Sequence, residues 1–218
     1  MKPVYAFDID GVLCSTKEVH RAALEAELGG VTLHDGGHYD AFGFHHDSDE
    51  ILEELRRIAM DLWRRPTVFA NGEASGQGVL RQLEGREQLA GYVTRRHPDL
   101  EWNTRKWLIE SDMPTKFRYD GDGHQYLSIH PLHHMLGDVD SKAAPAREMG
   151  ADTLVEDSPH EALLAARDGL NVVVLRVPYN KDFEQQCKLG RLTNATPSDP
   201  DYLTYFRIRF ISALQELL

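Results

Sequence analysis

The chain has 218 residues, 41% of them hydrophobic, and a formal net charge of −11 at pH 7. This length suits one domain, or a core with an inserted subdomain, and the apolar content is sufficient for a buried core. The negative charge argues against broad nucleic-acid binding, which requires a basic surface, but a small phosphorylated substrate can still be held by a local cluster of Lys or Arg.

No apolar run is long enough to span a bilayer, so no membrane partner is expected. The N-terminus lacks a signal-peptide pattern, because Asp8 and Asp10 interrupt its apolar segment. The two cysteines, Cys14 and Cys187, are too few for a disulfide framework. We therefore expect a protein of a reducing compartment, the cytoplasm.

The first predicted element is a strand over residues 4–7, followed by the segment Asp8-Ile9-Asp10-Gly11. Side chains separated by one residue along a strand point to the same side, so both carboxylates can face one small volume. Two close negative charges are costly without a cation, which favours a hard metal ion such as Mg²⁺ with space beside it for a phosphate. An ordinary Asp-Gly turn is the alternative that this fragment leaves open.

Two helices are predicted after this motif. Residues 18–28 are rich in Ala, Leu and Glu and stop at Gly29-Gly30, a usual helix end. Residues 49–63 carry apolar side chains at helical spacing before Pro66. The segment between the two helices is rich in Gly and His and does not resemble a core element.

We interpret residues 15–75 as a cap inserted after the first motif, with residues 1–14 and 76–218 as the core domain. Inserts at the carboxyl ends of parallel strands are well placed to cover a site, because such sheets bind ligands there. The rest of the chain alternates short apolar runs with helical patterns, which is typical of an α/β domain with a parallel sheet.

The remaining elements are predicted from this alternation. Strands are expected over residues 89–93, 153–155 and 172–175, and helices over 78–83, 100–109 and 143–149. Residues 202–218 carry apolar side chains that could form one stripe. A helix that docks on its own core is the first interpretation of this stripe, and a homodimer contact is the alternative.

Two segments in this region could bind a phosphate. Thr94 closes a predicted strand, and a Thr hydroxyl with nearby backbone N–H groups can bind phosphate oxygens, although Thr also fits a strand end for structural reasons alone. Lys142 lies at the start of a short helix, where a cation is electrostatically disfavoured unless it faces an anion. Lys116 is the rival candidate for this role, and a solvated surface lysine is the third interpretation.

A second acid pair, Glu156 and Asp157, follows a predicted strand. Ser158 offers a helix N-cap, Pro159 suits the first helical position and Glu161 completes a capping box, so the turn should hold the acids rigidly. Solvation alone does not explain a second acid pair beside a buried strand, although such an acid can also be an ordinary cap. We interpret the pair as the other half of a divalent-metal site.

In this order, the four segments resemble the motifs of the haloacid dehalogenase (HAD) superfamily of phosphotransferases. The matching residues are Asp8 to Gly11, Thr94, Lys142 and Glu156-Asp157. The resemblance covers most of residues 1–180 and implies a three-layer Rossmann-like α/β core with a central parallel sheet and a small, mainly helical cap. It also implies phosphoryl transfer, because the dehalogenases of the superfamily lack an acid at the second Asp.

The resemblance implies a role for each acid. Asp8 would be the nucleophile that forms an aspartyl-phosphate, and Asp10 would protonate the leaving group and then deprotonate the attacking water. Mg²⁺ would be the cofactor. Its ligands would be Asp8, the main-chain carbonyl of Asp10, Glu156 and Asp157. The family more often has Asp at the position of Glu156, so direct and water-mediated binding of the metal by Glu156 both stay open.

The resemblance also implies a phosphate-binding set. Thr94 and Lys142 would hold the transferring oxygens, and main-chain N–H groups near Gly11 and Arg95 would add donors. The partner of the protein would then be a small phosphorylated substrate.

Within the superfamily, Thr94-Arg95-Arg96-His97-Pro98 is similar to the Thr-x-Arg-Pro run of the 5′(3′)-deoxyribonucleotidase-like group, with one extra residue before the proline. Residues 177–180 are also similar to that group. We therefore expect a nucleoside 5′-monophosphatase with base contacts from Tyr39, Phe42 or Phe44, which could equally form the core of the cap. The alternatives are a polynucleotide 3′-phosphatase, another small-metabolite phosphatase, and a non-catalytic protein of the same fold that binds a phosphorylated ligand.

Histidines gather in two segments and raise the question of a zinc site. They are His34, His38, His45 and His46 in the cap, and His124, His130, His133 and His134 in a later loop. Their spacings fit no closed zinc ligand set. We interpret them as surface or substrate-facing residues.

Overall fold

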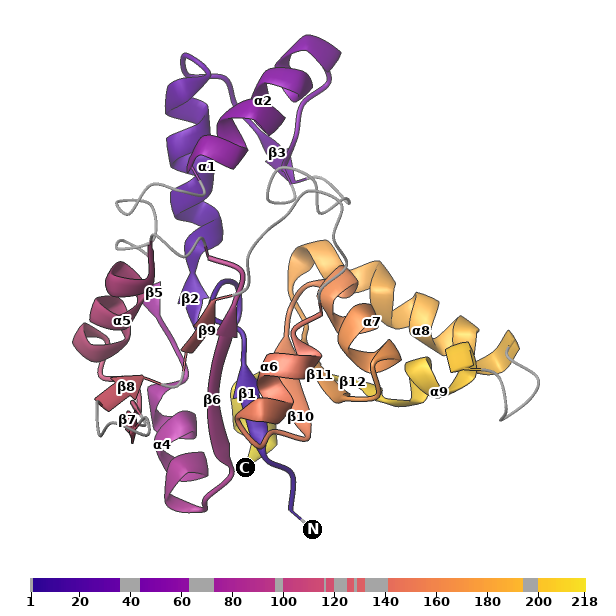
Figure 1. The fold of residues 1–218 in the computed structure, drawn as a ribbon. Coiled ribbons are helices and arrows are strands. Elements are labelled where there is room, and N and C mark those ends of the chain that lie inside the picture. The colour runs from indigo at the N-terminus through magenta and orange to yellow at the C-terminus, as the bar shows by residue number, and fades with distance from the viewer. Residues whose placement is uncertain are drawn as a thin grey trace.

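The computed structural model describes residues 2–35, 44–62, 73–96, 100–115, 117–119, 125–127, 129–131, 141–193 and 200–218. Within them, the main sheet has six strands, all parallel to their neighbours. Their order is β12 (Ile208–Ile211), β11 (Asn171–Leu175), β10 (Thr153–Glu156), β1 (Tyr5–Phe7), β6 (Leu89–Thr94) and β9 (Ile129–Pro131). The predicted α/β class with a central parallel sheet is confirmed (Figure 1).

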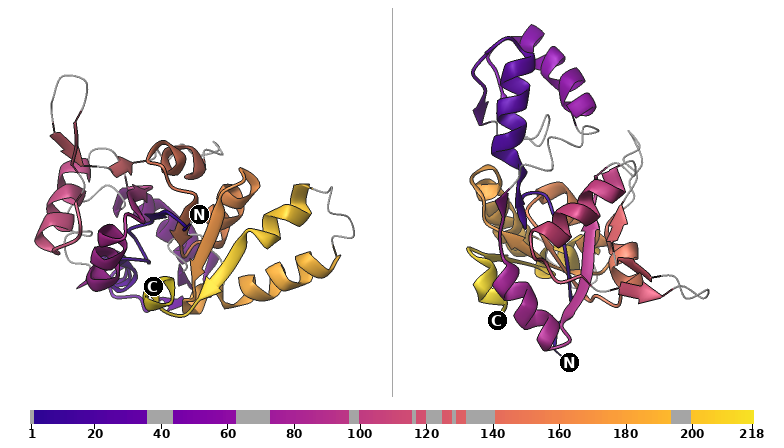
Figure 2. Two further views of the ribbon diagram at one scale, coloured as in Figure 1. Left: turned by 90° about the horizontal axis from the view of Figure 1, so that it is seen from below. Right: turned by 90° about the vertical axis from the view of Figure 1, so that its left-hand side faces the viewer.

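Helices cover both faces of the sheet and give the three layers visible in Figure 1 and Figure 2. One face packs against α4 (Gln77–Gly85), α5 (Glu101–Glu110) and the C-terminal turn η4 (Leu214–Leu217). The other face packs against α6 (Ala143–Glu148), α7 (Pro159–Arg167) and α8 (Lys181–Thr193), with α9 (Pro200–Phe206) against α7 and α8.

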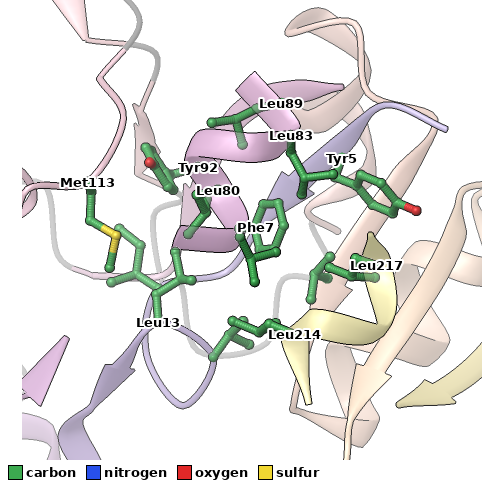
Figure 3. Packing of buried hydrophobic residues seen from close by; sticks show 14 of the residues in the cluster. Tyr5, Phe7, Leu13, Leu80, Leu83, Leu89, Tyr92, Met113, Leu214 and Leu217 are labelled. Carbon is green, nitrogen blue, oxygen red and sulfur yellow. The ribbon is translucent and has the colours of Figure 1, made fainter. Parts of the chain in front are cut away.

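Strand β1 illustrates how the sequence produces these two faces. Tyr5 and Phe7 belong to one hydrophobic cluster and Ala6 to the other, because successive side chains of a strand point to opposite faces. Both faces are buried, so the strand is a continuous apolar run without alternation. Figure 3 shows the Phe7 ring between Leu80 of α4 and Leu214 of η4. The strand that carries the first motif is therefore fixed at the centre of the core.

Two helices lie beyond the carboxyl end of β1, at the top of Figure 1. They are α1 (Thr16–Glu27) and α2 (Asp49–Leu62), with the antiparallel pair β3 (His34–Asp35) and β4 (Phe44–His45) between them. These elements share a hydrophobic cluster of their own, which includes Leu24 and Leu55. Phe44 belongs to this cluster and is 3% exposed, so it is a core residue of this unit and cannot stack on a nucleobase.

A short antiparallel pair joins this unit to the sheet domain. It consists of β2 (Cys14–Ser15) and β5 (Glu73–Ala74), which lie where the chain leaves the sheet domain and where it returns. We propose that this pair marks the boundary of the cap. The separate cluster around Leu24 supports that boundary, because the two helices bury their apolar faces against each other.

The predicted strands and helices of the core are found within a few residues of their expected bounds. The single helix expected over the last residues is wrong. Helix α9 ends at Phe206, and the chain continues as β12, which pairs with β11 and covers its edge. Ile208 and Ile211 at the two ends of β12 are buried, and this burial outweighs the helical spacing of the stripe. The antiparallel pair β7 (Phe117–Tyr119) and β8 (Gln125–Leu127) was not predicted either.

The two cysteines are free and lie in different layers of the core. Cys14 belongs to the cluster around Phe7, and Cys187 to the cluster on the opposite face of the sheet. Burial raises the pKa of the Cys14 thiol to about 12 and that of Cys187 to about 11. In the described parts of the chain, no helix combines the length and apolar character that crossing a membrane requires.

Candidate active site

The four predicted segments meet at one edge of the sheet. Strands β6, β1 and β10 are adjacent and parallel, so their carboxyl ends lie side by side. Asp8 follows β1, Thr94 ends β6 and Glu156 ends β10. Lys142 is the N-cap residue of α6, which packs on β6 and β10. Ligands of parallel α/β sheets bind at this edge, so the fold itself places these residues at a candidate site.

Three acids form a buried group, which we call the acid cluster: Asp8, Glu156 and Asp157. One carboxylate oxygen of each lies within 4.8 Å of the others. Burial raises the pKa of Asp8 and Asp157 well above the ordinary value, and the negative charge of Glu156 raises both further. Because burial and like charges both oppose ionisation, these carboxylates need a cation to be stable as anions.

Lys142 supplies one positive charge to the acid cluster. Its Nζ lies 2.8 Å from Asp8 Oδ1 and 2.8 Å from Glu156 Oε2. Burial opposes the charge of Lys142, but Asp8 and Glu156 outweigh burial and raise its pKa above the ordinary value. Burial alone would likewise raise the pKa of Glu156, and Lys142 lowers it overall. One lysine does not balance three ionised acids, so full ionisation of the cluster requires a further cation.

The acids differ in how complete their hydrogen bonding is. Asp157 Oδ1 is buried and has no hydrogen-bond partner among the described residues. Glu156 Oε1 accepts the main-chain N–H groups of Asp157 (3.1 Å) and Ser158 (3.0 Å), and its Oε2 accepts from Lys142. An unpartnered carboxylate oxygen in the acid cluster fits a hard cation such as Mg²⁺, which prefers oxygen ligands. Glu156 is instead held by its neighbours in the turn.

The carboxylate of Asp10 takes a different partner from that of Asp8. Arg96 donates from Nε to Asp10 Oδ2 (2.8 Å) and from Nη2 to Oδ1 (2.7 Å). The acid cluster does not include Asp10. The expectation that both carboxylates share one volume assumed that the strand continues to Asp10, but β1 ends at Phe7 and the chain turns. The main-chain carbonyl of Asp10 stays a predicted metal ligand.

Gly11 is required by the shape of this turn. Its φ is +84°, a conformation that L side chains rarely adopt, and a Cβ at this position would overlap the Asp157 carboxylate. Its N–H donates to the Cys14 carbonyl (2.9 Å). The Gly11 N–H, which we expected to face a phosphate, is therefore engaged inside the turn. Glycine is required at this position because a larger residue would collide with Asp157.

Thr94 and Arg95 lie on the β6 side of the site. Thr94 Oγ1 accepts the main-chain N–H of Arg96 (3.2 Å) and lies 3.5 Å from Asp10 Oδ2. Arg95 Nε donates to Glu161 Oε1 (2.7 Å) on α7, which turns the Arg95 side chain toward that helix. The Ser158 N-cap of α7 is confirmed by its acceptance of the Glu161 N–H at 3.4 Å. The ion pair between Arg95 and Glu161 was not predicted.

Asn180 is a site residue that the sequence did not reveal. It is buried in the short helix η3 (Pro178–Asn180). Its amide donates to the main-chain carbonyls of Asp157 (2.8 Å) and Leu175 (2.8 Å), and its Oδ1 accepts the Val177 N–H (3.0 Å). Asn180 thus fixes the backbone of Asp157. The only signal in the sequence was the similarity of residues 177–180 to the nucleotidase-like group, which gave no role.

The unit of α1 and α2, our proposed cap, contacts the sheet domain beside Asn180. The Lys17 Nζ lies 4.8 Å from the ring centroid of Tyr179 in η3 and 5.5 Å from that of Phe44 in the cap. A cation between two aromatic rings is a favourable contact. It links the first turn of α1 to the turn that holds Asp157.

Several candidates from the sequence lie outside what the structure describes. Of the eight histidines considered, only His34 and His46 have described side chains, and the acid cluster contains no histidine. His46 Nδ1 accepts the Ser48 N–H at 3.0 Å. Tyr39, Phe42 and Lys116 also lie outside the described residues.

No protein-family model and no curated protein matches this sequence. The structure is similar over 100% of both chains to a crystal structure described as a haloacid dehalogenase-like hydrolase from Bacteroides fragilis, with a TM-score of 0.57 and 16% identity. It is also similar to a hydrolase of the haloacid dehalogenase-like family from Streptococcus pneumoniae, with a TM-score of 0.51 and 13% identity over 99% of this chain and 96% of that chain. The fold is therefore HAD-like, as the four motifs implied. Neither description names the deoxyribonucleotidase-like group, so that finer assignment is a proposal.

Proposed function

We propose that the protein is a Mg²⁺-dependent phosphomonoester hydrolase that works through an aspartyl-phosphate on Asp8. The observation that carries this proposal is the buried acid cluster with Lys142 Nζ 2.8 Å from Asp8. Phosphoryl transfer through a carboxylate requires three things in one site: a nucleophilic carboxylate, a fixed cation, and further acids with free oxygens that can bind a metal ion.

In the first step, Lys142 binds Asp8 Oδ1, so attack on phosphorus falls to Oδ2. The new O–P bond forms while the ester P–O bond breaks, and Asp10 gives its proton to the leaving oxygen. In the second step, Asp10 accepts a proton from water, which attacks the same phosphorus and releases inorganic phosphate from Asp8. Thr94, Lys142 and the main-chain N–H of Arg95 hold the phosphoryl oxygens.

The acid cluster would hold the metal ion through Asp8 and Asp157, with the carbonyl of Asp10 as a further ligand and Glu156 beside them. Mg²⁺ bound there supplies positive charge that offsets the repulsion between the phosphate and the carboxylates. The presence of Asp10 favours phosphate esters over organic halides as substrates. A departing halide needs no proton, whereas a departing alkoxide does.

We propose a nucleoside 5′-monophosphate as the first substrate class, on the similarity of residues 94–98 to the nucleotidase-like group. Phe44 is excluded as a stacking residue by its burial, and Tyr179 beside Lys17 is the described aromatic that remains on the cap side of the site. A Mg²⁺-supplemented screen of nucleoside monophosphates, sugar phosphates and 3′-phosphorylated oligonucleotides tests this class. Turnover of the oligonucleotides alone would favour the polynucleotide 3′-phosphatase.

The replacement Asp8→Asn tests the nucleophile. It removes the attacking charge with little change in shape, and we expect phosphatase activity to fall by about 10³-fold or more while the thermal unfolding transition remains cooperative. Asp168→Asn at the far end of α7 is the matched control and should keep its activity. Near-native turnover by Asp8→Asn would show that the nucleophile is assigned wrongly.

A further inference from the structure

The contact between Arg96 and Asp10 is the most completely fixed ion pair of the site. Both carboxylate oxygens of Asp10 accept an N–H from the same guanidinium, at 2.8 and 2.7 Å. The Arg96 side chain is 1% exposed, and that of Asp10 is largely buried. A bidentate pair of this kind sets the plane of the carboxylate as well as its position.

Arg96 is itself held from two further directions. Its Nη1 donates to Thr104 Oγ1 of α5 (3.3 Å), and its Cζ lies 5.5 Å from the ring centroid of Trp107 on the same helix. Cys14, at the start of the cap connection, is a further electrostatic neighbour of the Arg96 side chain. Burial opposes the charge of Arg96, but Asp10 outweighs burial and raises the pKa of Arg96 overall. The guanidinium is therefore a rigid, charged support.

We infer that Arg96 is a positioning residue that aims the Asp10 carboxyl at the leaving oxygen and then at the attacking water. The guanidinium takes one lone pair of each Asp10 oxygen, so the transferred proton leaves from, and returns to, a lone pair that Arg96 does not occupy. The inference rests on the proposed phosphatase function. Asp10 lies in the turn after β1, where an isolated β-bridge with Cys14 fixes its backbone but does not set the plane of its carboxylate. Proton transfer requires the donor and acceptor atoms within hydrogen-bond distance, and a misplacement of about 1 Å can cost about 100-fold in rate. The pair with Arg96 supplies the missing constraint.

The replacement Arg96→Met tests this role, because it keeps much of the side-chain volume and removes both guanidinium donors to Asp10, leaving only the 3.5 Å contact from Thr94 Oγ1. The value of kcat/KM reports the steps up to formation of the phosphoenzyme, in which Asp10 protonates the leaving group. We expect kcat/KM to fall about 100-fold for an alkyl ester such as glycerol phosphate, and by less than about 10-fold for p-nitrophenyl phosphate, whose leaving group needs little protonation.

Hydrolysis of the phosphoenzyme gives a second readout that a structural role would not produce. Asp10 must also activate water, so Arg96→Met should accumulate the aspartyl-phosphate. With p-nitrophenyl phosphate, we expect a pre-steady-state burst of nitrophenol close to one equivalent per active site, followed by slow turnover. Methylguanidine in the assay should restore part of the lost activity by occupying the vacated space.

Two further variants keep the test decisive if Arg96→Met folds poorly. Thr104→Val removes one hydrogen bond to Arg96 and leaves the ion pair in place. The ratio of kcat/KM for glycerol phosphate to that for p-nitrophenyl phosphate should therefore fall, but by less than in Arg96→Met. Arg191→Lys removes an arginine that holds the carbonyls of Tyr205 and Ile208 far from the site, and it should leave the ratio unchanged.

Equal losses on both esters without a burst would overturn the inference, because they describe a protein that has only lost stability. Failure of the proposed function has a different signature. In that case the wild-type protein hydrolyses neither ester, or Asp8→Asn remains active. Either result would also refute the inference about Arg96, because it depends on the proposed function.

Discussion

Asp157 combines three properties that make a carboxylate unstable in the folded protein. It is buried, its Oδ1 has no hydrogen-bond partner among the described residues, and it lies against Asp8 and Glu156. Its pKa is raised well above the ordinary value of 3.8, with burial as the largest cause. The same residue is where Mg²⁺ would bind. The buried, unpartnered carboxylate therefore both lowers the stability of the metal-free protein and gives it affinity for the ion.

The raised pKa of Asp157 predicts how the stability of the metal-free protein depends on pH. As pH rises above 3.8, the unfolded chain releases the Asp157 proton before the folded protein does, so stability falls until the pH passes the raised pKa. Metal-free Asp157→Asn lacks this loss, and we expect its Tm at pH 7 to exceed that of the wild type by about 3 °C. Thermal unfolding in EDTA at pH 4 to 8 measures the difference.

Added Mg²⁺ provides the control for this experiment. It should raise the Tm of the wild type at pH 7 more than at pH 5, because protonated carboxyls bind the ion poorly, and it should have little effect on Asp157→Asn. Identical pH dependence of the two proteins in EDTA would contradict the account of Asp157.

The sequence was sufficient to find residues whose role follows from a local pattern. Asp8, Lys142 and Asp157 each adjoin a strand end or a helix start, and the fold brings them together. It was not sufficient for Asp10 and Asn180. The direction of the Asp10 side chain depends on a turn and on Arg96, and the role of Asn180 depends on contacts with two carbonyls distant in the chain.

At the scale of elements, the turns after the strands determine where the acids lie. Gly11 follows the first acid pair with φ +84°, and the Asp157 carboxylate fills the space that a side chain would need. Gly150 follows α6 with φ +88° and has open space around it. The two glycines share a backbone conformation and differ only in their surroundings.

This difference gives a matched pair of substitutions. Gly150→Ala should lower the free energy of unfolding by about 1 kcal/mol through backbone strain alone. Gly11→Ala adds a collision with Asp157, so it should destabilise the protein further and weaken Mg²⁺ binding. Urea unfolding measures the first effect, and calorimetric titration with Mg²⁺ measures the second. Equal effects of the two substitutions on stability and Mg²⁺ affinity would refute the proposed contact.

Elements with a strong apolar pattern were predictable, and polar or ambiguous ones were not. The buried strands β1, β6, β10 and β11 are apolar on both faces and stand out from their surroundings. Helix α8 buries Phe183 and Cys187 but leaves Leu189 half exposed, and most of its other residues are polar, so its apolar periodicity is weak. The stripe that includes Phe206 and Phe210 fits a helix by spacing, but Phe206 remains half exposed and Phe210 belongs to a strand.

At the scale of the whole molecule, the described residues of the sheet domain and of the smaller unit that we propose as the cap have separate hydrophobic clusters. Leu55 lies in the cap cluster and Leu80 in the cluster around Phe7, and both are fully buried. Because the clusters share no residue, the cap can lose stability without the sheet domain.

Two leucine truncations test this separation. Each of Leu55→Ala and Leu80→Ala should remove about 2–5 kcal/mol of local packing. For Leu55→Ala, we expect faster amide hydrogen exchange confined to residues 16–62, with the protection of β1 and β10 retained. Leu80→Ala should instead speed exchange throughout the sheet domain. Uniform loss of protection in Leu55→Ala would mean that cap and sheet domain unfold as one unit.

The overall fold could be predicted because three of the four motifs follow apolar runs that form adjacent parallel strands, and the fourth, Lys142, begins a helix that packs on them. Substrate specificity could not be predicted in the same way. In the proposed function it would be set by side chains of the proposed cap, and contacts such as Lys17 with Tyr179 join segments distant in the sequence. No local pattern encodes such a contact.

The burial of both thiols has a practical consequence. The thiolate is the form that reacts with alkylating dyes, and Cys14 and Cys187 keep their protons at neutral pH and lie out of reach of solvent. Labelling in the native state is therefore limited by how often the chain opens. Because the two thiols lie on opposite faces of the sheet, the order in which they take up the dye reports which layer separates first.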